Sequence, residues 1–280
     1  MVYFLPDHTE NRMLIPKLRD DAEKIIETFI KNRVEEAQAS GVAIGLSGGL
    51  DSTVVARLCV RAIGKDKVIG VMMPERQSNP KDLDDALLIS KSLGIEHLVV
   101  DISEAVESFL KSTSHAKTKE SAANVKARCR MVVLYYIANS TNRLVMGCAN
   151  KTEIMIGYFT KFGDGGADYM PIGDLYKTQV RELANKLQIQ NVILEKTPSA
   201  GLWEGQTDEG EIGISYDVLD QILYGLETGA SPKQIAKEAG SDLDTVKKVQ
   251  EKIKITVHKR RLPLIPKIGF KTPSFDWREP

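Results

Sequence analysis

The feature that most constrains this chain is a short apolar run that ends in a glycine turn and continues as a helix. The run is Val-Ala-Ile-Gly-Leu at 42–46, the turn is Ser-Gly-Gly at 47–49, and apolar residues recur at helical spacing over 51–63. A buried strand that enters a tight turn and then a helix is typical of α/β folds. The sequence therefore predicts a strand–turn–helix unit over residues 42–63.

The same alternation continues along the chain. Helical spacing also covers residues 17–39, 82–93 and 121–139, and further apolar runs cover 68–73, 97–100 and 144–147. Strands that alternate with helices of this length predict a doubly wound, mostly parallel sheet with helices on both faces. In such folds ligands bind at the edge formed by the carboxyl ends of the strands.

The second half of the chain has a different pattern. Two glycine-containing segments, 157–174 and 198–213, have the length of binding loops or lids. From residue 216 the chain is predicted to be helical, and it ends in a proline-punctuated tail at 262–280. No internal repeat separates these parts, so we predict one domain over residues 1–280.

Composition excludes several classes of protein. Lys plus Arg and Asp plus Glu both number 38 in 280 residues, and this balance argues against a nucleic-acid partner held by charge alone. The three cysteines are too few and too far apart for a disulfide framework or a zinc site. The sequence has neither a signal-peptide layout at its beginning nor an apolar stretch long enough to span a bilayer. We therefore expect a cytoplasmic protein without a membrane partner.

The turn has the residues of a phosphate-binding loop. Paired glycines let backbone N–H groups converge, and the following helix N-terminus favours an anion. A Walker loop would place a lysine here, whereas this loop has the acid Asp51. A carboxylate beside phosphates needs a divalent cation between them, so Asp51 implies Mg²⁺. A glycine pair alone would indicate an ordinary turn. The phosphate-binding prediction rests on the whole string from the strand through residues 47–53 to the helix.

The string Ser-Gly-Gly-Leu-Asp-Ser at 47–52 resembles the SGGxDS loop of the ATP-pyrophosphatase, or adenylating, superfamily. The resemblance implies an adenine nucleotide alpha-hydrolase-like fold. It also implies an enzyme that splits ATP between its α and β phosphates and transfers AMP to an oxygen of a poor electrophile. A nucleophile then displaces the AMP. The activation is needed because an ordinary carboxylate resists attack by ammonia.

Strings further along the chain resemble one branch of that superfamily, the ammonia-dependent NAD synthetases. These strings lie at residues 150–153, 157–168, 171–178, 198–203, 206–209 and 258–260. One position departs from the family pattern: Cys148 stands where the family usually has a threonine that contacts ATP. A thiol is a weaker hydrogen-bonding group than a hydroxyl.

The resemblance implies a role for each matching residue. The implied ATP site consists of Gly45, Leu46, Ser47, Gly48, Gly49, Leu50, Asp51, Ser52, Cys148, Lys177 and Ser199. The implied Mg²⁺ ligands are Asp51 and Glu153. The implied site for deamido-NAD, the acid to be amidated, consists of Arg128, Lys161, Asp168, His258 and Lys259. Ammonia is the implied nitrogen source, and the implied assembly is a homodimer with dinucleotide sites shared between its subunits.

Two other interpretations remain open at this point. Other SGGxDS enzymes include GMP synthetase, asparagine synthetase and tRNA-thiolating enzymes. The amidotransferases among them need a glutaminase domain or partner, and we expect none within this chain. Residues 231–249 have the spacing of a helix-turn-helix, which on its own suggests a DNA-binding regulator. However, Asp242 and Asp244 begin the second helix, where phosphates would be repelled. We expect a helical hairpin that packs on the sheet or on a dimer partner.

Overall fold

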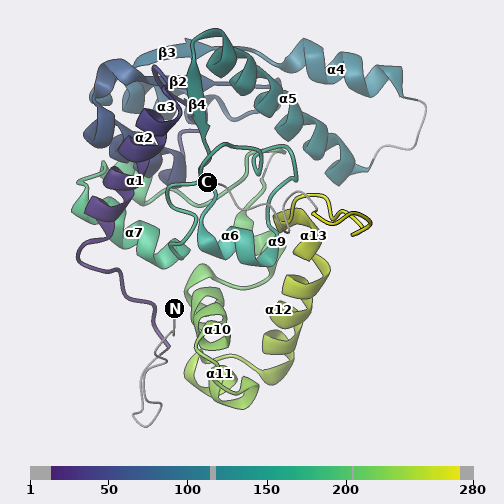
Figure 1. Cartoon of the computed structure of the whole chain (residues 1–280). Coiled ribbons are helices and arrows are strands. Elements are labelled where there is room, and N and C mark those ends of the chain that lie inside the picture. The colour runs from purple at the N-terminus through teal and green to yellow at the C-terminus, as the bar shows by residue number, and fades with distance from the viewer. Residues whose placement is uncertain (1–13, 114–117, 204, 272–280) are drawn as a thin grey trace.

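A computed structural model describes residues 14–113, 118–203 and 205–271 (Figure 1). The beginning of the chain and the end of the predicted tail, with Trp277, lie outside these residues. Within the described ranges, no helix combines the length and the apolarity that crossing a membrane requires.

The sheet has four parallel strands in the order β3-β2-β1-β4. Its strands are β1 (Gly41–Gly45), β2 (Val68–Met72), β3 (Glu96–Val99) and β4 (Arg143–Met146). The register pairs Val42 with Val68 on one side and with Leu144 on the other. All four carboxyl ends therefore meet at one edge, as the sequence predicted.

Alternate side chains of the strands pack against different layers of helices. Val42 and Ile44 belong to the core beneath α1 (Ala22–Glu36), α2 (Leu50–Ile63), α3 (Pro80–Leu93) and α7 (Lys177–Lys186). Ala43, Ile69 and Val71 point to the other face, where α5 (Lys119–Ser140) covers them. The central strands β1 and β2 are buried on both faces and are therefore almost wholly apolar, whereas the edge strand β3 is largely exposed. The predicted doubly wound α/β class is confirmed.

The sequence analysis did not predict several of the helices, and two of them bear on the candidate site. The first, α4 (Ser103–Ser112), packs on α5 and leaves Phe109 62% exposed. The second, α9 (Asp208–Ile212), begins where the Thr207 side chain accepts a hydrogen bond from the Gly210 backbone N–H. The prediction of an irregular loop over 198–213 was therefore wrong at its end, where a five-residue helix replaces it.

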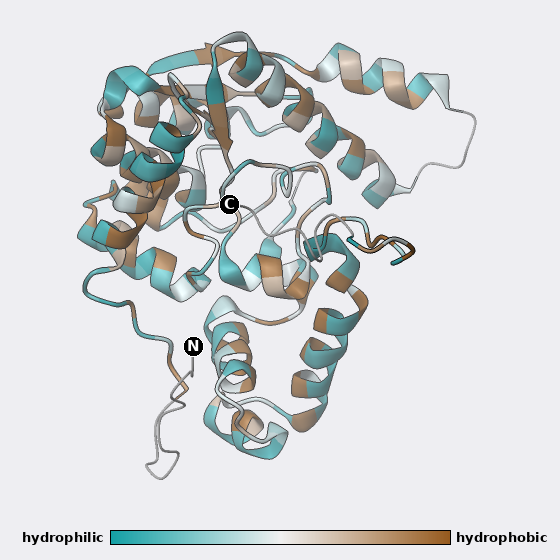
Figure 2. Cartoon of the chain, in the orientation of Figure 1, coloured by the Kyte–Doolittle hydropathy of each residue, from teal (hydrophilic) through white to brown (hydrophobic). Residues whose placement is uncertain are grey.

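The C-terminal helices form a second core beside the sheet layers. It is built mainly from α10 (Tyr216–Glu227), α11 (Pro232–Glu238) and α12 (Leu243–Ile255), and Figure 1 shows these helices grouped on the side away from β2 and β3. The short helix α13 (Val257–Arg260) follows α12 and has no buried residue. Apolar and polar residues alternate along α12 (Figure 2), and Val246 and Val249 are its buried positions. The suspected helix-turn-helix is α11 and α12. It packs on α10, and α12 also contacts α6 (Lys151–Ile156), so its main contacts are with helices and not with the sheet. Packing on a dimer partner, the other predicted alternative, stays a prediction. Asp242 caps α12, accepting a hydrogen bond from the Thr245 N–H.

Candidate active site

The glycine turn lies between β1 and α2, at the carboxyl edge of the sheet. Gly48 has a φ of +71°, which favours glycine, and a Cβ there would lie 2.3 Å from the Asp82 carbonyl oxygen. Gly49 is the N-cap of α2 in an extended conformation, and because glycine has no side chain, it cannot cap the helix with one. The turn is therefore packed tightly against the beginning of α3, while the first N–H groups of α2 lack a side-chain cap.

Hydroxyl groups hold this turn in shape. The Ser47 Oγ accepts from the Gly49 N–H at 3.2 Å and lies 3.1 Å from the Ser52 Oγ. The Thr53 hydroxyl donates to the Gly49 carbonyl at 2.7 Å. Uncapped N–H groups at a helix N-terminus, beside the exposed Ser47, can bind an anion such as pyrophosphate.

Three charged side chains meet beside the turn. Lys177, the first residue of α7, is buried and forms an ion pair with Asp51 of α2. Its Nζ also lies 3.8 Å from an oxygen of Glu153. The Asn150 side chain caps α6 by accepting from the Glu153 N–H, and its amide lies 3.4 Å from Asp51. The structure thus brings together residues predicted from three separate strings.

The surroundings of these groups shift their proton affinities. Burial raises the pKa of the Glu153 carboxyl, the charge of Asp51 raises it further, and Lys177 opposes both. Burial alone would lower the pKa of Lys177, but the charges of Asp51 and Glu153 outweigh it, so the net change is upward. When Glu153 is ionised, the two carboxylates carry more negative charge than one lysine balances, and this repulsion adds to the effect of burial on the pKa of Glu153.

This excess negative charge fits a divalent cation. Mg²⁺ is usually held by one or two carboxylates together with waters and substrate phosphates. Asp51 and Glu153 supply two such carboxylates next to the anion-binding turn. In the described ranges, no group of three or more His, Cys, Asp or Glu side chains is arranged to hold a metal without such help.

Asp208 is a member of this site that the sequence analysis did not assign. It is 5% exposed and accepts hydrogen bonds from the hydroxyls of Tyr158 and Tyr216. Burial raises the pKa of its carboxyl, while Lys177 opposes the change. The signal was present in the string at 206–209, where an acid follows the helix-capping Thr207. The pattern did not reveal that this acid is buried.

The residues implied for the dinucleotide form a second group, around α13. The Arg128 guanidinium donates to the Lys161 carbonyl at 3.3 Å. The Lys161 Nζ donates to the His258 carbonyl at 2.6 Å and to that of Arg261 at 3.0 Å. The Lys259 Nζ donates to the carbonyls of Gly157 and Phe159, both at 2.8 Å. Four of the five implied residues are therefore adjacent.

The other implied residues have separate surroundings. Asp168 accepts from the Val145 N–H at 2.8 Å and from the Tyr135 hydroxyl at 3.0 Å, which attaches it to β4 and α5. Ser199 is exposed, and its Oγ accepts from the Gly201 N–H. Burial and, secondarily, Asp51 raise the pKa of the Cys148 thiol, which keeps this group protonated at neutral pH.

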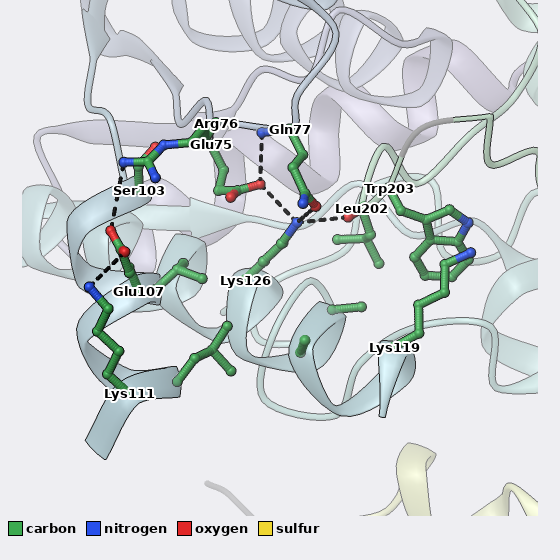
Figure 3. A pocket seen from close by; sticks show the side chains of 14 residues that line it. Glu75, Arg76, Gln77, Ser103, Glu107, Lys111, Lys119, Lys126, Leu202 and Trp203 are labelled. Carbon is green, nitrogen blue, oxygen red and sulfur yellow. Dashed lines mark hydrogen bonds and ion pairs between the residues drawn. The ribbon is translucent and has the colours of Figure 1, made fainter. Parts of the chain in front are cut away.

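Two loops near the carboxyl edge are joined by a buried lysine (Figure 3). Lys126 of α5 pairs with Glu75 at 2.8 Å and donates to the Gln77 side chain and the Leu202 carbonyl. Beside it lies a cavity of about 400 Å³ between these loops, α4 and α5. The Trp203 ring lines this cavity, with the Lys119 Nζ 4.1 Å from the ring centroid.

Residues 23–263 match the family described as NAD synthase. The chain belongs to this family. The match covers both groups of residues described above, from the strand before the phosphate loop to the end of α13. The resemblance seen in the sequence is therefore confirmed.

Individual relatives agree with the family match. The chain is 49% identical over 247 residues to an NH(3)-dependent NAD(+) synthetase of Methanocaldococcus jannaschii, covering 87% of this chain and 95% of the relative. A structure of an NMN synthetase from Francisella tularensis superposes with a TM-score of 0.79 at 36% identity, covering 89% of this chain and 98% of that one. A Campylobacter jejuni NH3-dependent NAD synthetase gives 0.76 at 31% identity, covering 88% and 98%.

Proposed function

We propose that this chain is an ammonia-dependent NAD synthetase, a ligase that forms the carboxamide of NAD from deamido-NAD, ammonia and ATP. The observation that carries the proposal is the meeting of the 47–52 turn, Lys177, Asp51 and Glu153 at the carboxyl edge of the sheet. The curated relatives at 43–49% identity support the substrate and the nitrogen source.

The proposed reaction has two steps. A carboxylate oxygen of deamido-NAD attacks the α-phosphorus of ATP, and the bond to the β-phosphate oxygen breaks, so pyrophosphate leaves. Ammonia then attacks the acyl carbon of the adenylate, AMP leaves with the electron pair of the C–O bond, and one proton is released. In both steps the enzyme's main task is to hold reacting groups together and stabilise the charge that develops.

The residues of the first group would divide this work. The N–H groups at the beginning of α2 and the hydroxyls of Ser47 and Ser52 would bind the departing pyrophosphate. Asp51 and Glu153 would hold Mg²⁺, which supplies positive charge opposite the phosphate oxygens. Lys177, buried and charged, would stabilise the same oxygens from the side of α7.

The second group would bind the dinucleotide. Arg128, Lys161 and Lys259 place three cations around the segment that begins at Gly157. Deamido-NAD carries two phosphates and a carboxylate, so positive charge here favours its binding. The proposed dinucleotide site also includes Asp168, from the 157–174 segment, and His258 of α13.

A homodimer is part of the proposal. Val132 and Tyr136, one turn apart on α5, are 60% and 73% exposed, and Phe109 of the adjacent α4 is 62% exposed. Large apolar side chains exposed on one face of a helix, such as Val132 and Tyr136, are typical of a protein interface. We expect light scattering of the pure protein to give twice the mass of the chain, and Tyr136→Glu to give a monomer.

The test is to mix the pure protein with ATP, Mg²⁺, an ammonium salt and deamido-NAD and to measure NAD, AMP and pyrophosphate. We expect all three products in equal amounts, and a rate that rises with pH because NH₃ is the nucleophile. Glutamine in place of ammonium should give little NAD. Nicotinic acid mononucleotide is the necessary comparison, since one structural relative is described as an NMN synthetase. A faster rate with the mononucleotide would contradict the proposed substrate. If no pyrophosphate forms with either acid, the proposed reaction is contradicted.

A further inference from the structure

A lysine outside both proposed groups contacts the phosphate loop from behind. The Lys196 Nζ donates to the Gly48 carbonyl at 2.9 Å. The same nitrogen lies 2.8 Å from an Asp82 oxygen and 2.7 Å from an Asp85 oxygen, both on α3. An ammonium group has three N–H donors, and these three partners account for all of them. Lys196 thereby joins the phosphate loop to α3.

The carbonyl that Lys196 holds controls the direction of an N–H group in the loop. In a trans peptide the carbonyl and the following N–H point to opposite sides of the chain. The Gly48 carbonyl is directed back toward Lys196 and α3, so the Gly49 N–H is directed to the opposite side, where the Ser47 Oγ lies. With two successive glycines, this peptide plane has little resistance of its own to rotation.

The charge of Lys196 is already balanced by its neighbours. Burial alone would lower the pKa of its ammonium, but the hydrogen bonds and charges of Asp82 and Asp85 outweigh it, so the pKa lies above the usual value. The ammonium therefore stays charged, and two carboxylates more than neutralise it. A phosphate would therefore gain little from its charge.

We propose that Lys196 is a positioning residue for ATP: by holding the Gly48 carbonyl against α3, it keeps the Gly49 N–H on the Ser47 hydroxyl and the N–H groups that follow directed at the pyrophosphate part of the nucleotide. The inference rests on the proposed function of this loop as the ATP site. Lys196 also begins the segment that carries Ser199 and Trp203, only a few residues further along the chain. The same side chain thus fixes the distance between the phosphate loop and the base of that segment.

The direct test is Lys196→Met in the full-length protein. Binding of ATP and of inorganic pyrophosphate, both with Mg²⁺, would be measured by calorimetry and compared with binding of deamido-NAD. We expect ATP and pyrophosphate to bind about tenfold more weakly or worse, the size expected for a lost hydrogen bond to a charged group. Deamido-NAD should bind within about twofold of the wild type. Lys196→Arg, which keeps the charge and both carboxylate partners, should recover part of the affinity.

The matched control is Lys186→Met, which removes an exposed lysine paired with Glu182 on α7 and should leave all three affinities unchanged. Unchanged ATP and pyrophosphate binding in Lys196→Met would overturn the inference. So would an equal loss for all three ligands, because that is the result of general destabilisation. If Lys196→Met does not fold, Asp85→Asn decides: we expect a twofold to fivefold loss of ATP affinity, about the effect of weakening one partner, and wild-type affinity would overturn the inference. These binding measurements remain decisive even if the wild type forms no NAD, in which case only the proposed reaction fails.

Discussion

The phosphate loop and the group around α13 both hold positive charge beside glycine-rich backbone, yet they are built differently. In the phosphate loop, consecutive residues from Gly45 to Ser52 supply the turn, the hydroxyls and the helix N-terminus. Around α13, the cations come from α5, from the 157–168 segment and from the C-terminal helices. There, Lys161 and Lys259 donate to backbone carbonyls of segments remote in sequence.

The difference shows which site depends on long-range folding. The phosphate loop is fixed mainly by local hydrogen bonds and by close packing against α3, to which Lys196 adds a contact from a remote segment, so few substitutions elsewhere should alter its shape. The α13 group is held together by its own lysines, because Lys161 and Lys259 donate to backbone carbonyls of segments remote in sequence. A substitution there should alter the shape of the site as well as its charge, and each of the following measurements tests this contrast.

The largest effect should follow Asp51→Asn. The change keeps the shape of the side chain but removes the charge that pairs with Lys177 and is proposed to hold Mg²⁺. Losing a metal ligand at the reacting phosphates costs several kcal/mol, so we expect kcat to fall about a hundredfold or more. Circular dichroism should show an intact fold. Asp244→Asn, an exposed acid paired with Lys248, is the matched control and should keep full activity. A variant at position 51 with most of its rate would contradict the metal assignment.

A smaller and more selective effect should follow Lys259→Met. The change removes a cation and also releases the carbonyls of Gly157 and Phe159. We expect the KM for deamido-NAD to rise about tenfold, the loss typical of hydrogen bonds from a charged group, while the KM for ATP stays within about twofold. Steady-state kinetics with each substrate varied in turn gives both values. Lys254→Met, on the exposed side of α12, is the control. Equal changes in both KM values would mean that the two regions are not independent.

Cys148 should contribute least to the rate. If its thiol replaces a hydroxyl contact to ATP, Cys148→Thr should keep or slightly lower the KM for ATP. Cys148→Ala should cost about 1 kcal/mol, or roughly fivefold in that KM, because one neutral hydrogen bond is lost. Burial keeps the thiol protonated, which is unfavourable for a nucleophile. Loss of all turnover in the alanine variant would instead assign a catalytic thiol and favour a sulfur-transfer enzyme.

The same contrast explains what could be predicted from the sequence. The strand–turn–helix unit was predictable because its strand period, its glycines and the helix period are consecutive. The whole parallel sheet followed from the repetition of that unit. The helix α4 was missed although it is amphipathic, since its ten residues lie between a short edge strand and a longer helix. The packing of α11 and α12 on α10 also escaped prediction, because an apolar helix face does not reveal its partner.

The site shows the same limit at the level of single residues. Asp51 and Glu153 were predicted to act together because the family resemblance linked them, and the ion pairs of Lys177 join them in space. Asp208 and Lys196 lie in or beside the same strings and received no role. Burial and the direction of a side chain decide the role of such residues, and both arise from contacts between segments far apart in the chain. Composition and spacing carry no record of those contacts.

The smallest expected effect is a change in tryptophan fluorescence from Trp203, which lies in the 198–213 segment. We predict that the 157–174 and 198–213 segments become more ordered when substrates bind, because an acyl-adenylate is hydrolysed if water reaches it. Trp203 lies in the second segment, against Lys119 and beside the Lys126 contacts to Glu75 and Leu202 (Figure 3). Its emission should therefore change when ATP, Mg²⁺ and deamido-NAD are added together.

The measurement needs a chain with one tryptophan, and Trp277→Phe provides it because Trp203 and Trp277 are the only two. Lys119→Met in that background removes the cation over the ring and should change the emission before any ligand is added, which shows that the probe senses its surroundings. ATP with Mg²⁺ alone reports the phosphate loop region, and deamido-NAD alone reports the α13 group. If either ligand alone gives the full change, closure depends on one region. If the spectrum and the protease cutting near Trp203 are the same with all ligands and without them, the segment is static and the site stays open during the reaction.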